Sequence, residues 1–582
     1  MAEGYRGVIG WALDHRAAMV VLAVGSMISA FTLLWNGVLG FLALLLGLVV
    51  SVWSLSSARP LPLRLAGTVA GAVIGVGLFL VVPEWHKVGV GFMPIDDRSE
   101  FNVQIETPPG SNLAYTRAKA EEADRIIRAR PDVMYSYVTL GDPTSSAVDV
   151  GKMYVKLAPK NERPLDAEGI GAEVRSELVQ LGGVDMALFT SDMGGGRKQL
   201  ALQVKGPDLV SINAGAEQVR AAVAATEGAV DIELSSKGQR PELTVDLDRG
   251  LAGALGLTAG QVAQALRPAF AGIDAGDWVD PSGETRDVVV RLAPSSRRRA
   301  EDLRQLPLLI PGGVNGVPRT VPLGQVVTVR SDLAPAVINH LDRDLVVDVE
   351  WNTQGRSTGE VMSDVRKALA QTSLPPGVTY SEGGDAERQS EVFGNIFLAL
   401  GVAVLLMYLI LVMQFGSFLD PMAILMSLPL SLVGVMLSLA ITGLTVNIMS
   451  LIGVILLMGI VAKNAILLID FAKWSNEKGM PIREALIEAG AIRLRPILMT
   501  TFALIAGMIP VAIASGEGAQ FRQPLGVAVI GGVLTSTMLT LLVIPTVYEI
   551  FFDWREALGE WIRSKRGGTA APEIAAVAGA GD

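Results

Sequence analysis

Apolar residues in this chain gather into long blocks near its two ends, and a polar stretch separates them. Each block is close to the ~20 residues that a helix needs to cross a bilayer. Three blocks precede the polar stretch and five follow it, at residues 17–35, 37–55, 65–82, 392–414, 421–442, 447–472, 496–514 and 524–551. The pattern predicts an α-helical membrane protein with one to three N-terminal spans, the first retained as an anchor, and five C-terminal spans.

The polar stretch, about residues 84–391, alternates strand and helix patterns. "EFNVQIET", the helical pattern of "NLAYTRAKAEEADRIIRA" and "MYSYVTL" are followed by "KMYVKLAP", "GIGAEVRSELVQL" and "VDMALFT". This repeated order predicts a ferredoxin-like split βαβ unit. A second unit starts at "KQLALQVKG" and ends with "GVTYSEG", and an insertion rich in Gly, Pro and Arg, about residues 247–334, divides it.

The basic residues near the predicted spans indicate the orientation of the chain. They precede the first span, separate the second from the third, fill the longest C-terminal loop and follow the last span: Arg6, Arg16, Arg59, Arg64, Lys473, Lys478, Arg483, Arg493, Arg495, Arg563, Lys565 and Arg566. Because basic loops stay in the cytoplasm, both termini are predicted to be cytoplasmic and the polar stretch to lie across the membrane.

The composition excludes several kinds of site. The chain has no cysteine, and its three histidines, His15, His86 and His340, are far apart in sequence, so we expect neither a thiolate nor a histidine metal site. A net charge of −10 offers no basic face to nucleic acid. No nucleophile, base and oxyanion arrangement can be recognised, which argues against a hydrolase. We expect no enzyme activity and no cofactor.

One lysine interrupts an apolar block. In "GIVAKNAILLIDFA", Lys463 lies eight residues before Phe471, about 12 Å along a helix. At that depth its stem reaches the headgroups with difficulty, and a lysine at the bilayer centre costs roughly 2.5–3.5 kcal/mol. We therefore favour a functional lysine with an acidic partner over one that snorkels to the interface.

The predicted spans supply poor acidic partners for Lys463. Asp470 lies on the same helix, about 10 Å away along its axis, and Glu549 lies in the last turn of the final span. Both are close to the cytoplasmic boundary and are better explained as interfacial residues. Unless water solvates Lys463, the sequence predicts that its carboxylate comes from another chain.

Two other polar residues of the spans have open explanations. Arg493, in "RLRPILMT", can be an anchor at the cytoplasmic boundary, and Thr500 can hydrogen-bond to its own helix. Both can equally belong to a polar site with Lys463.

The segments "GFMPIDDRSEFNVQIETPPGSNLAYT", "PELTVDLDRGLAGALGLT", "YLILVMQFGSFLDPMAILMSLPL", "GIVAKNAILLIDFA" and "RLRPILMTTFALIAGMIPVAI" follow one another in order within residues 84–552. Together with "YRGVIGWALDHR" and the first span, they resemble the second half of resistance-nodulation-division (RND) efflux transporters, in the hydrophobe/amphiphile exporter branch. Full-length members have twelve spans in two pseudo-repeats, and this chain resembles one repeat.

The resemblance implies a domain organisation. It gives N-terminal transmembrane segments at 1–83, porter subdomains at 84–197 and at 198–246 with 335–391, a docking subdomain at 247–334, a five-helix transmembrane domain at 392–552 and a cytoplasmic tail at 553–582. It also implies a trimeric proton antiporter of the inner-membrane lipid bilayer, with a periplasmic adaptor protein and an outer-membrane channel as partners. The apolar hairpin at 37–82 departs from the family pattern.

The resemblance also implies a proton relay. Lys463 matches the intramembrane lysine of the family, Asn464 its neighbour, and Arg493 and Thr500 the arginine and threonine of the following span. In the family these residues surround a proton-binding Asp-Asp pair that the first repeat supplies. No span of this chain contains Asp-Asp, so the pair is expected from an N-terminal half, as a separate chain or a missing part of the gene.

Two functions fit these expectations. The first is half of a proton-driven exporter that moves hydrophobic or amphiphilic compounds out of the inner membrane or periplasm by alternating access. The second is a non-transporting scaffold or export-assisting subunit, which would not need Lys463. The sequence assigns no substrate-binding residue, and the stretch from Thr139 to Thr190 has only Tyr154 and Phe189 as aromatics, so multidrug specificity does not follow.

Overall fold

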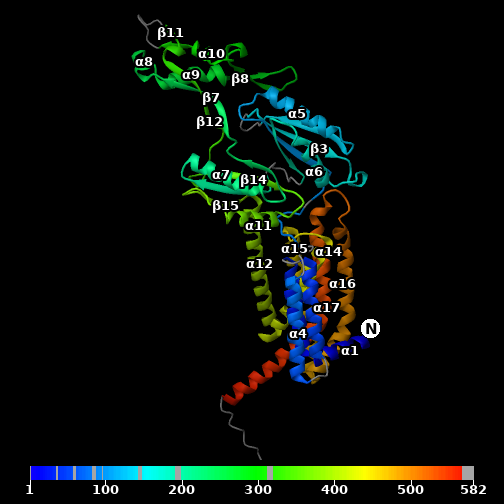
Figure 1. The fold of residues 1–582 in the computed structure, drawn as a ribbon. Helices are drawn as coiled ribbons and strands as arrows, with labels where there is room; N and C mark the ends of the chain where they lie inside the picture. The colour runs from blue at the N-terminus through cyan, green and yellow to red at the C-terminus, as the bar shows by residue number, and fades with distance from the viewer. Residues whose placement is uncertain are drawn as a thin grey trace, which may run out of the picture.

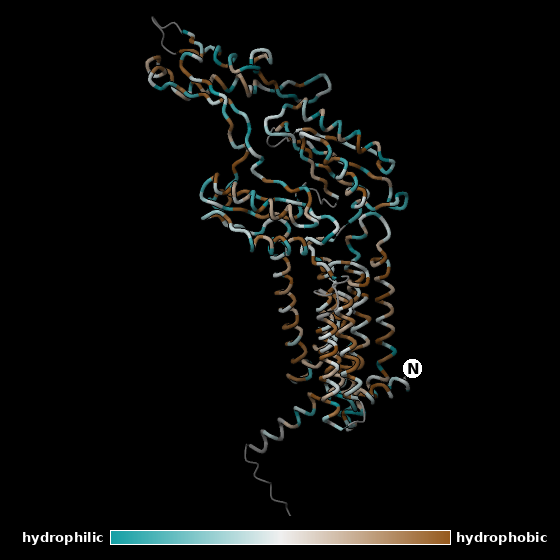
Figure 2. The backbone as a smooth tube through the Cα atoms, in the orientation of Figure 1, coloured by the Kyte–Doolittle hydropathy of each residue, from teal (hydrophilic) through white to brown (hydrophobic). Residues whose placement is uncertain are grey.

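A computed structural model describes residues 2–34, 37–56, 60–81, 87–94, 96–141, 147–190, 198–310 and 319–565. In these residues a helical bundle carries an elongated α/β part at one end (Figure 1). We call the end of the bundle next to the α/β part proximal and the other end distal. Apolar residues run along the bundle helices, whereas polar and apolar residues alternate in the α/β part (Figure 2).

Ten α-helices build the bundle. They are α1 (Ala2–Asp14), α2 (Arg16–Phe31), α3 (Gly37–Ser56), α4 (Leu61–Val81), α12 (Gly384–Phe415), α13 (Leu419–Leu425), α14 (Ser427–Thr442), α15 (Ile448–Glu477), α16 (Ile482–Ile513) and α17 (Gln523–Lys565). Within the described residues, seven helical stretches are long and apolar enough to cross a membrane, and α1 with α2, bent by 92°, forms an eighth if the pair is one span.

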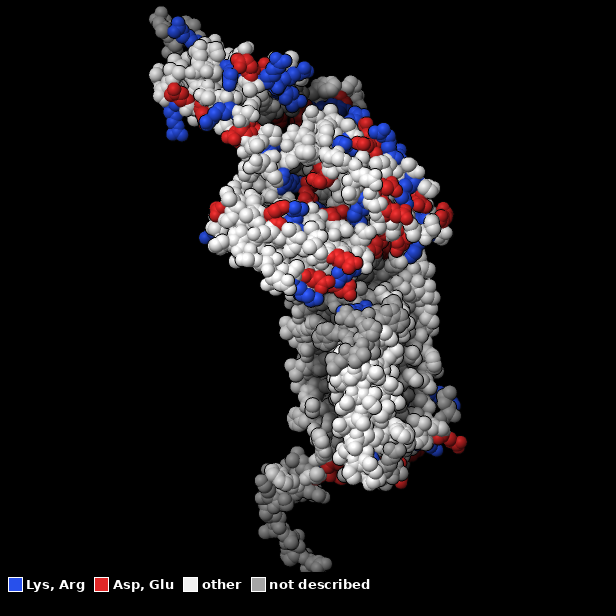
Figure 3. Space-filling view, viewed as in Figure 1, with Lys and Arg blue, Asp and Glu red and all other residues white. Residues whose placement is uncertain are grey.

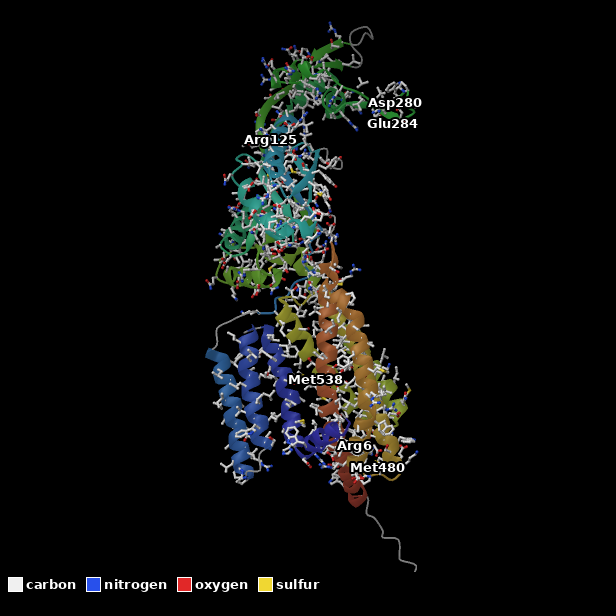
Figure 4. The ribbon with its side chains drawn as sticks, turned by 90° about the vertical axis from the view of Figure 1, so that its right-hand side faces the viewer. Arg6, Arg125, Asp280, Glu284, Met480 and Met538 are labelled. Carbon is white, nitrogen blue, oxygen red and sulfur yellow. The ribbon has the colours of Figure 1, made fainter. Side chains whose placement is uncertain are left out.

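The N-terminal helix α1 was not predicted from the sequence. Its apolar side chains Ile9, Ala12 and Leu13 are fully buried, and the Tyr5 hydroxyl donates to the carbonyl of Leu541 on α17 at 2.7 Å. Figure 4 shows Arg6 of α1 and Met480 of the loop between α15 and α16 at the same, distal end of the bundle.

The apolar hairpin at 37–82 forms the antiparallel pair α3 and α4. The two helices approach closely through glycines: a Cβ at Gly47 would lie 2.5 Å from the Gly71 carbonyl oxygen. The Nε2 of His15 lies 3.0 Å from the carbonyl oxygen of Ser56, which ties the distal end of α3 to the corner between α1 and α2. Arg59 and Arg566, both expected on the cytoplasmic side, lie outside the described residues.

The first α/β unit contains β1 (Glu100–Glu106), α5 (Leu113–Arg128), β2 (Val133–Leu140), β3 (Val150–Leu157), α6 (Ala167–Leu178) and β4 (Asp185–Phe189). Its antiparallel sheet has the order β2-β3-β1-β4, which is that of a ferredoxin-like unit. Burial alternates along β1 because one face of the sheet lies under α5 and α6. The other face carries polar side chains, which include Glu100 and Glu106.

The second α/β unit contains β5 (Leu200–Gly206), α7 (Leu209–Ala224), β6 (Ala229–Leu234), β13 (Asn339–Leu341), β14 (Asp344–Thr353), α11 (Thr358–Leu369) and β15 (Thr379–Gly383). Its sheet has the order β13-β14-β5-β15, and β6 also pairs with β14. Helices α7 and α11 cover one face around the fully buried Trp351. Strand β15 continues directly into α12, so α12 begins eight residues before the apolar block predicted at 392–414.

The insertion in the second unit stands on a two-stranded ribbon of β7 (Gln239–Leu247) and β12 (Val327–Pro335). It contains α8 (Arg249–Ala254), α9 (Ala259–Phe270), β8 (Ile273–Val279), β9 (Thr285–Val290), α10 (Ala300–Arg304), β10 (Pro307–Ile310) and β11 (Arg319–Pro322). Strands β8 and β9 form a projecting hairpin with Asp280 and Glu284 near its tip (Figure 4). In the view of Figure 3, charged side chains gather on the α/β part, including this insertion.

Candidate functional site

Lys463 lies on a side of α15 that no other described element covers. The exposed residues of α15 lie on one side of the helix and define what we call the open face: Ile452, Ile455, Leu456, Gly459, Lys463, Asp470, Trp474 and Glu477. Among the described residues, Lys463 forms no hydrogen bond or ion pair. The apolar part of this face around Lys463 is a poor surface for lipid, because Asp470, seven residues further along, is too far away to neutralise the lysine.

The two acids predicted in the spans do not reach Lys463. Asp470 is exposed on the open face, seven residues further along α15. Glu549 of α17 is only 2 % exposed and forms an ion pair with Arg16 at 3.0 Å. Its carboxylate therefore pairs with α2 at the distal end of the bundle and does not pair with Lys463.

A third buried acid, Asp420, was missed from the sequence because it lies one residue before the apolar block at 421–442. It is the second residue of α13 and 4 % exposed. Lys473 of α15 and Arg555 of α17 face it at 3.8 and 3.7 Å. This cluster joins three helices at the distal end and leaves Lys463 without a partner.

Arg493 of α16 lies against α15. Its guanidinium is 5.4 Å from the ring centroid of Phe471, a distance at which cation–π attraction operates. Its Nε is buried, and among the described residues it has no hydrogen-bond partner. Arg493 therefore points toward the neighbouring helix and keeps an unused donor.

Thr500 and Asn464 occupy the same level of the antiparallel pair α15 and α16. Since Arg493 meets Phe471, the residue seven positions after Arg493 lies opposite the residue seven positions before Phe471, about 10 Å further along the axis. Asn464 is 8 % exposed. Thr500 is exposed, and its hydroxyl donates to the Ile497 carbonyl at 3.0 Å. The four predicted residues thus share the α15 and α16 pair, and no hydrogen bond or ion pair joins any two of these four described side chains.

A cavity of about 1170 Å³ separates the two α/β units. Two lining residues link the units: Arg175 of α6 forms an ion pair with Asp231 of β6 at 2.9 Å. The Asn352 amide also donates to Asp231, at 3.0 Å. Among the described residues that line the cavity, acidic and basic side chains are equal in number and none is aromatic.

Two glutamates meet across this cavity. Glu106 comes from β1 and Glu233 from β6, and each has a lysine partner, Lys237 at 2.8 Å and Lys198 respectively. Burial raises the pKa of Glu233 to about 7, and the adjacent Glu106 adds to the rise. Although burial also acts on Glu106, hydrogen bonds from Glu233 and Lys237 hold the pKa of Glu106 below its ordinary value. A protonated Glu233 therefore donates to an ionised Glu106.

This glutamate pair was also missed from the sequence. The alternation of "EFNVQIE" puts Glu106 on the polar face of β1, but nothing in the sequence indicates that β6 of the other unit faces it.

A second cavity, of about 950 Å³, lies where the two α/β units meet the start of α12. Its lining combines four phenylalanines with six acidic and three basic residues: Phe92, Phe101, Phe189, Phe521, Asp96, Glu100, Asp348, Glu350, Asp385, Glu387, Arg98, Lys198 and Arg388. The lining therefore has a net charge of −3 when every carboxyl is ionised. Burial raises the pKa of Asp348 above its ordinary value. In the part of the chain that the structure describes, no three His, Cys, Asp or Glu residues are grouped as metal ligands.

The sequence of the chain matches a known family of transporters. Residues 63–552 match the model of the AcrB/AcrD/AcrF family. The chain belongs to this family of RND efflux transporters. The match covers the two α/β units, the insertion and the bundle helices from α4 to α17, so the resemblance to RND transporters is confirmed.

Curated relatives of the chain are cation efflux proteins. It is 28 % identical over 574 residues to "Cation efflux system protein CzcA" of Alcaligenes sp. strain CT14, and 28 % identical over 572 residues to "Cobalt-zinc-cadmium resistance protein CzcA" of Cupriavidus metallidurans CH34. Each match covers 94 % of this chain and 53 % of the relative. The chain spans about half the length of these relatives, and they give no support to the hydrophobe/amphiphile branch.

Solved structures show the same fold. A heavy metal efflux pump, solved in two crystal forms, matches with a TM-score of 0.66 and 20 % identity in each. The first match covers 95 % of this chain and 67 % of the pump. The RND fold, with helical spans and a mixed α/β part, is therefore confirmed.

Proposed function

We propose that this chain forms the C-terminal half of a proton-driven RND exporter of the inner membrane, and that an N-terminal half completes its proton site. That half belongs to the same or to another polypeptide. Proton entry is worth about 2.3 kcal/mol per charge per 100 mV of membrane potential, which is enough to drive a conformational cycle.

The single observation that carries the proposal is the unpaired Lys463 on the open face of α15. An acidic pair on a partner helix would neutralise Lys463, and the open face would then be covered rather than exposed to lipid. Thr500, on the adjacent α16, lies at the level of Asn464 and can donate to the same carboxylates, and Arg493, about 10 Å away along the axis, adds positive charge on the same helix. A scaffold subunit would gain nothing from a cation at this depth, so this alternative has no comparable support.

The assembly follows from the family. The complete exporter is a trimer, the two α/β units are periplasmic porter subdomains, and the insertion on the ribbon of β7 and β12 is the docking subdomain. A periplasmic adaptor protein and an outer-membrane channel receive the substrate. The distal end, where α1 and the loop between α15 and α16 lie, faces the cytoplasm.

The proposed substrate is a cation. The cavity beside α12 has an excess of carboxylates, and the curated relatives are named for cation efflux. Its phenylalanines also suit the apolar body of an amphiphilic cation, in line with the hydrophobic or amphiphilic cargo expected from the sequence. Two classes of candidate substrate should be tested for transport: cobalt, zinc and cadmium ions are the first class, and hydrophobic organic amines are the second.

Copurification tests the proposed pairing. The chain is coexpressed with an N-terminal RND half that carries six spans and Asp-Asp in the fourth, with cysteine replacing Gly459 of the open face in one partner and residues of the fourth span in the other. We expect copurification and a thiol crosslink between the two. Purification of the chain without that half, and no crosslink at any position, would contradict the proposal.

A further inference from the structure

The loop between α16 and α17, residues 514–522, forms polar contacts with the first α/β unit. The backbone N–H of Asp97 donates to the Gln520 side chain at 3.0 Å, and the N–H of Gly518 donates to the Asp97 carbonyl at 3.1 Å. Lys156 of β3 also faces Glu517 of the loop at 3.7 Å. Three contacts in one short loop therefore hold α16 and α17 to this unit.

Asp97, the residue that the loop contacts, is part of a buried hydrogen-bonded network. The Asp97 carboxylate pairs with Arg163, whose side chain is fully buried, and accepts from the N–H of Ala167, the first residue of α6, at 3.1 Å. Arg163 donates in turn to the carbonyls of Ala158 and Leu165, at 3.0 and 2.8 Å. Because removal of one partner strands a buried charge, such a network resists deformation and transmits a displacement as a unit.

The loop 514–522 directly follows α16, the helix that carries Arg493 and Thr500. After the loop, Gly526 in the first turn of α17 packs tightly on the end of α16: a Cβ there would lie 2.8 Å from the Ala512 nitrogen. Because the end of α16 and the start of α17 are packed together, a shift of α16 displaces both ends of the loop. The second α/β unit has its own link, since β15 continues into α12.

We infer that Gln520 and the loop 514–522 carry movements of α16 into the first α/β unit through Asp97 and Arg163, so that Gln520 is a positioning residue for the transport cycle. The inference rests on the proposed proton-driven function. It requires that the loop and the first unit move together while the cavity between the two units opens and closes.

A labelling experiment tests this inference. The complete pump, with a cysteine-free N-terminal half, is reconstituted in liposomes with cysteine replacing Val148, which lines the cavity and is 41 % exposed. Its rate of labelling by N-ethylmaleimide is compared with and without a pH gradient, in Gln520→Ala and in the control Gln523→Ala. The Gln523 side chain donates to the Ala512 carbonyl within the helix pair at 3.1 Å, and among the described residues it forms no hydrogen bond to the first unit.

We expect the gradient to change labelling in the parent and in Gln523→Ala. In Gln520→Ala the change and the transport rate should fall about fivefold, the effect of one lost hydrogen bond. A full response in Gln520→Ala would overturn the inference. A parent pump whose labelling ignores the gradient would instead contradict the proton-driven function itself.

Crosslinking gives an independent readout, because the chain contains no cysteine. Cysteines replacing Lys156 and Glu517 are joined by bis-maleimidoethane. If the loop and the unit move together, the crosslinked pump keeps its transport rate. Inhibition by the crosslink in a pump that transports normally before it would show that this contact must open, and would overturn the inference.

Discussion

Lys463 and Asn464 are consecutive residues of α15 that lie on different sides of the helix: Lys463 is exposed on the open face, whereas Asn464 is 8 % exposed among neighbouring helices. The lysine is thus presented outward from the folded half, and the asparagine is held inside it. This arrangement suits a site that is completed by another half.

Replacement of Lys463 should separate folding from transport. Because Lys463 forms no hydrogen bond or ion pair with the described residues, we expect Lys463→Ala to insert and fold normally but to abolish transport by the completed pump. Lys463→Arg should also fail, since a planar fork does not replace a compact point charge. Lys478→Ala, at the end of α15, is the matched control and should transport normally. Parent-level transport by a well-expressed Lys463→Ala protein would remove Lys463 from the proton site.

The hairpin of α3 and α4 should have its turn in the cytoplasm. The contact between His15 and Ser56 puts the end of α3 at the distal end of the bundle. A cysteine at Ser56 should therefore react with a membrane-impermeant thiol reagent only after the cytoplasmic side is opened. A cysteine at Ser176, exposed on α6, should react in intact spheroplasts. Reaction of the Ser56 position from outside would show that the hairpin has the opposite orientation.

The glutamate pair predicts a dependence of stability on pH. Glu233 has a pKa of about 7 in the folded protein, raised from an ordinary 4.5, so the folded form binds this proton more tightly than the unfolded chain. The stabilisation from this proton is complete below about pH 4.5 and is lost as pH rises through 7, and the rise of the pKa from 4.5 to about 7 corresponds to roughly 3 kcal/mol. This shift places the change between about pH 5 and 8. Thermal unfolding of the purified chain across that range measures how steeply the free energy of unfolding falls with pH.

Glu233→Gln should flatten that slope, whatever it does to the absolute stability through the loss of a partner for Lys198. The control is Glu217→Gln, because Glu217 pairs with Arg220 on the surface of α7 and its pKa is lowered by that arginine. An unchanged slope in Glu233→Gln would assign the titration to another group.

Close packing of α14 on α17 should make one glycine indispensable. A Cβ at Gly434 would lie 2.1 Å from the carbonyl oxygen of Gly531, whereas Gly507 has open space around it. We expect Gly434→Ala to lower the stability of the bundle by about 1–3 kcal/mol, as overpacking does, and Gly507→Ala to have little effect. Equal melting temperatures of the two variants in detergent would contradict this packing.

The long-range regularities of the fold were predictable from the sequence. Blocks of about 20 apolar residues mark spans whatever packs on them, and the alternation of "EFNVQIE" defines one buried and one polar face of β1 because side chains of a strand point to opposite sides. Helix α1 escaped prediction because its 13 residues mix polar and apolar positions and are too few to span a bilayer.

The candidate site was predictable only where one residue carries the signal. Lys463 stands out because a charge in an apolar block is costly wherever it lies. The pairing of Glu233 with Glu106, and of Gln520 with Asp97, depends on segments that meet only after the α/β units and the bundle have packed. No local pattern in the sequence records such contacts.

Transport by purified protein tests the half-exporter account most directly. The chain alone is reconstituted in liposomes with an imposed pH gradient, and movement of zinc ions and of an organic amine is followed, with and without the N-terminal half. We predict no gradient-driven movement by the chain alone. Transport should appear with the added half and should be lost when either its Asp-Asp pair or Lys463 is replaced. Robust proton-coupled transport by this chain alone would contradict the account.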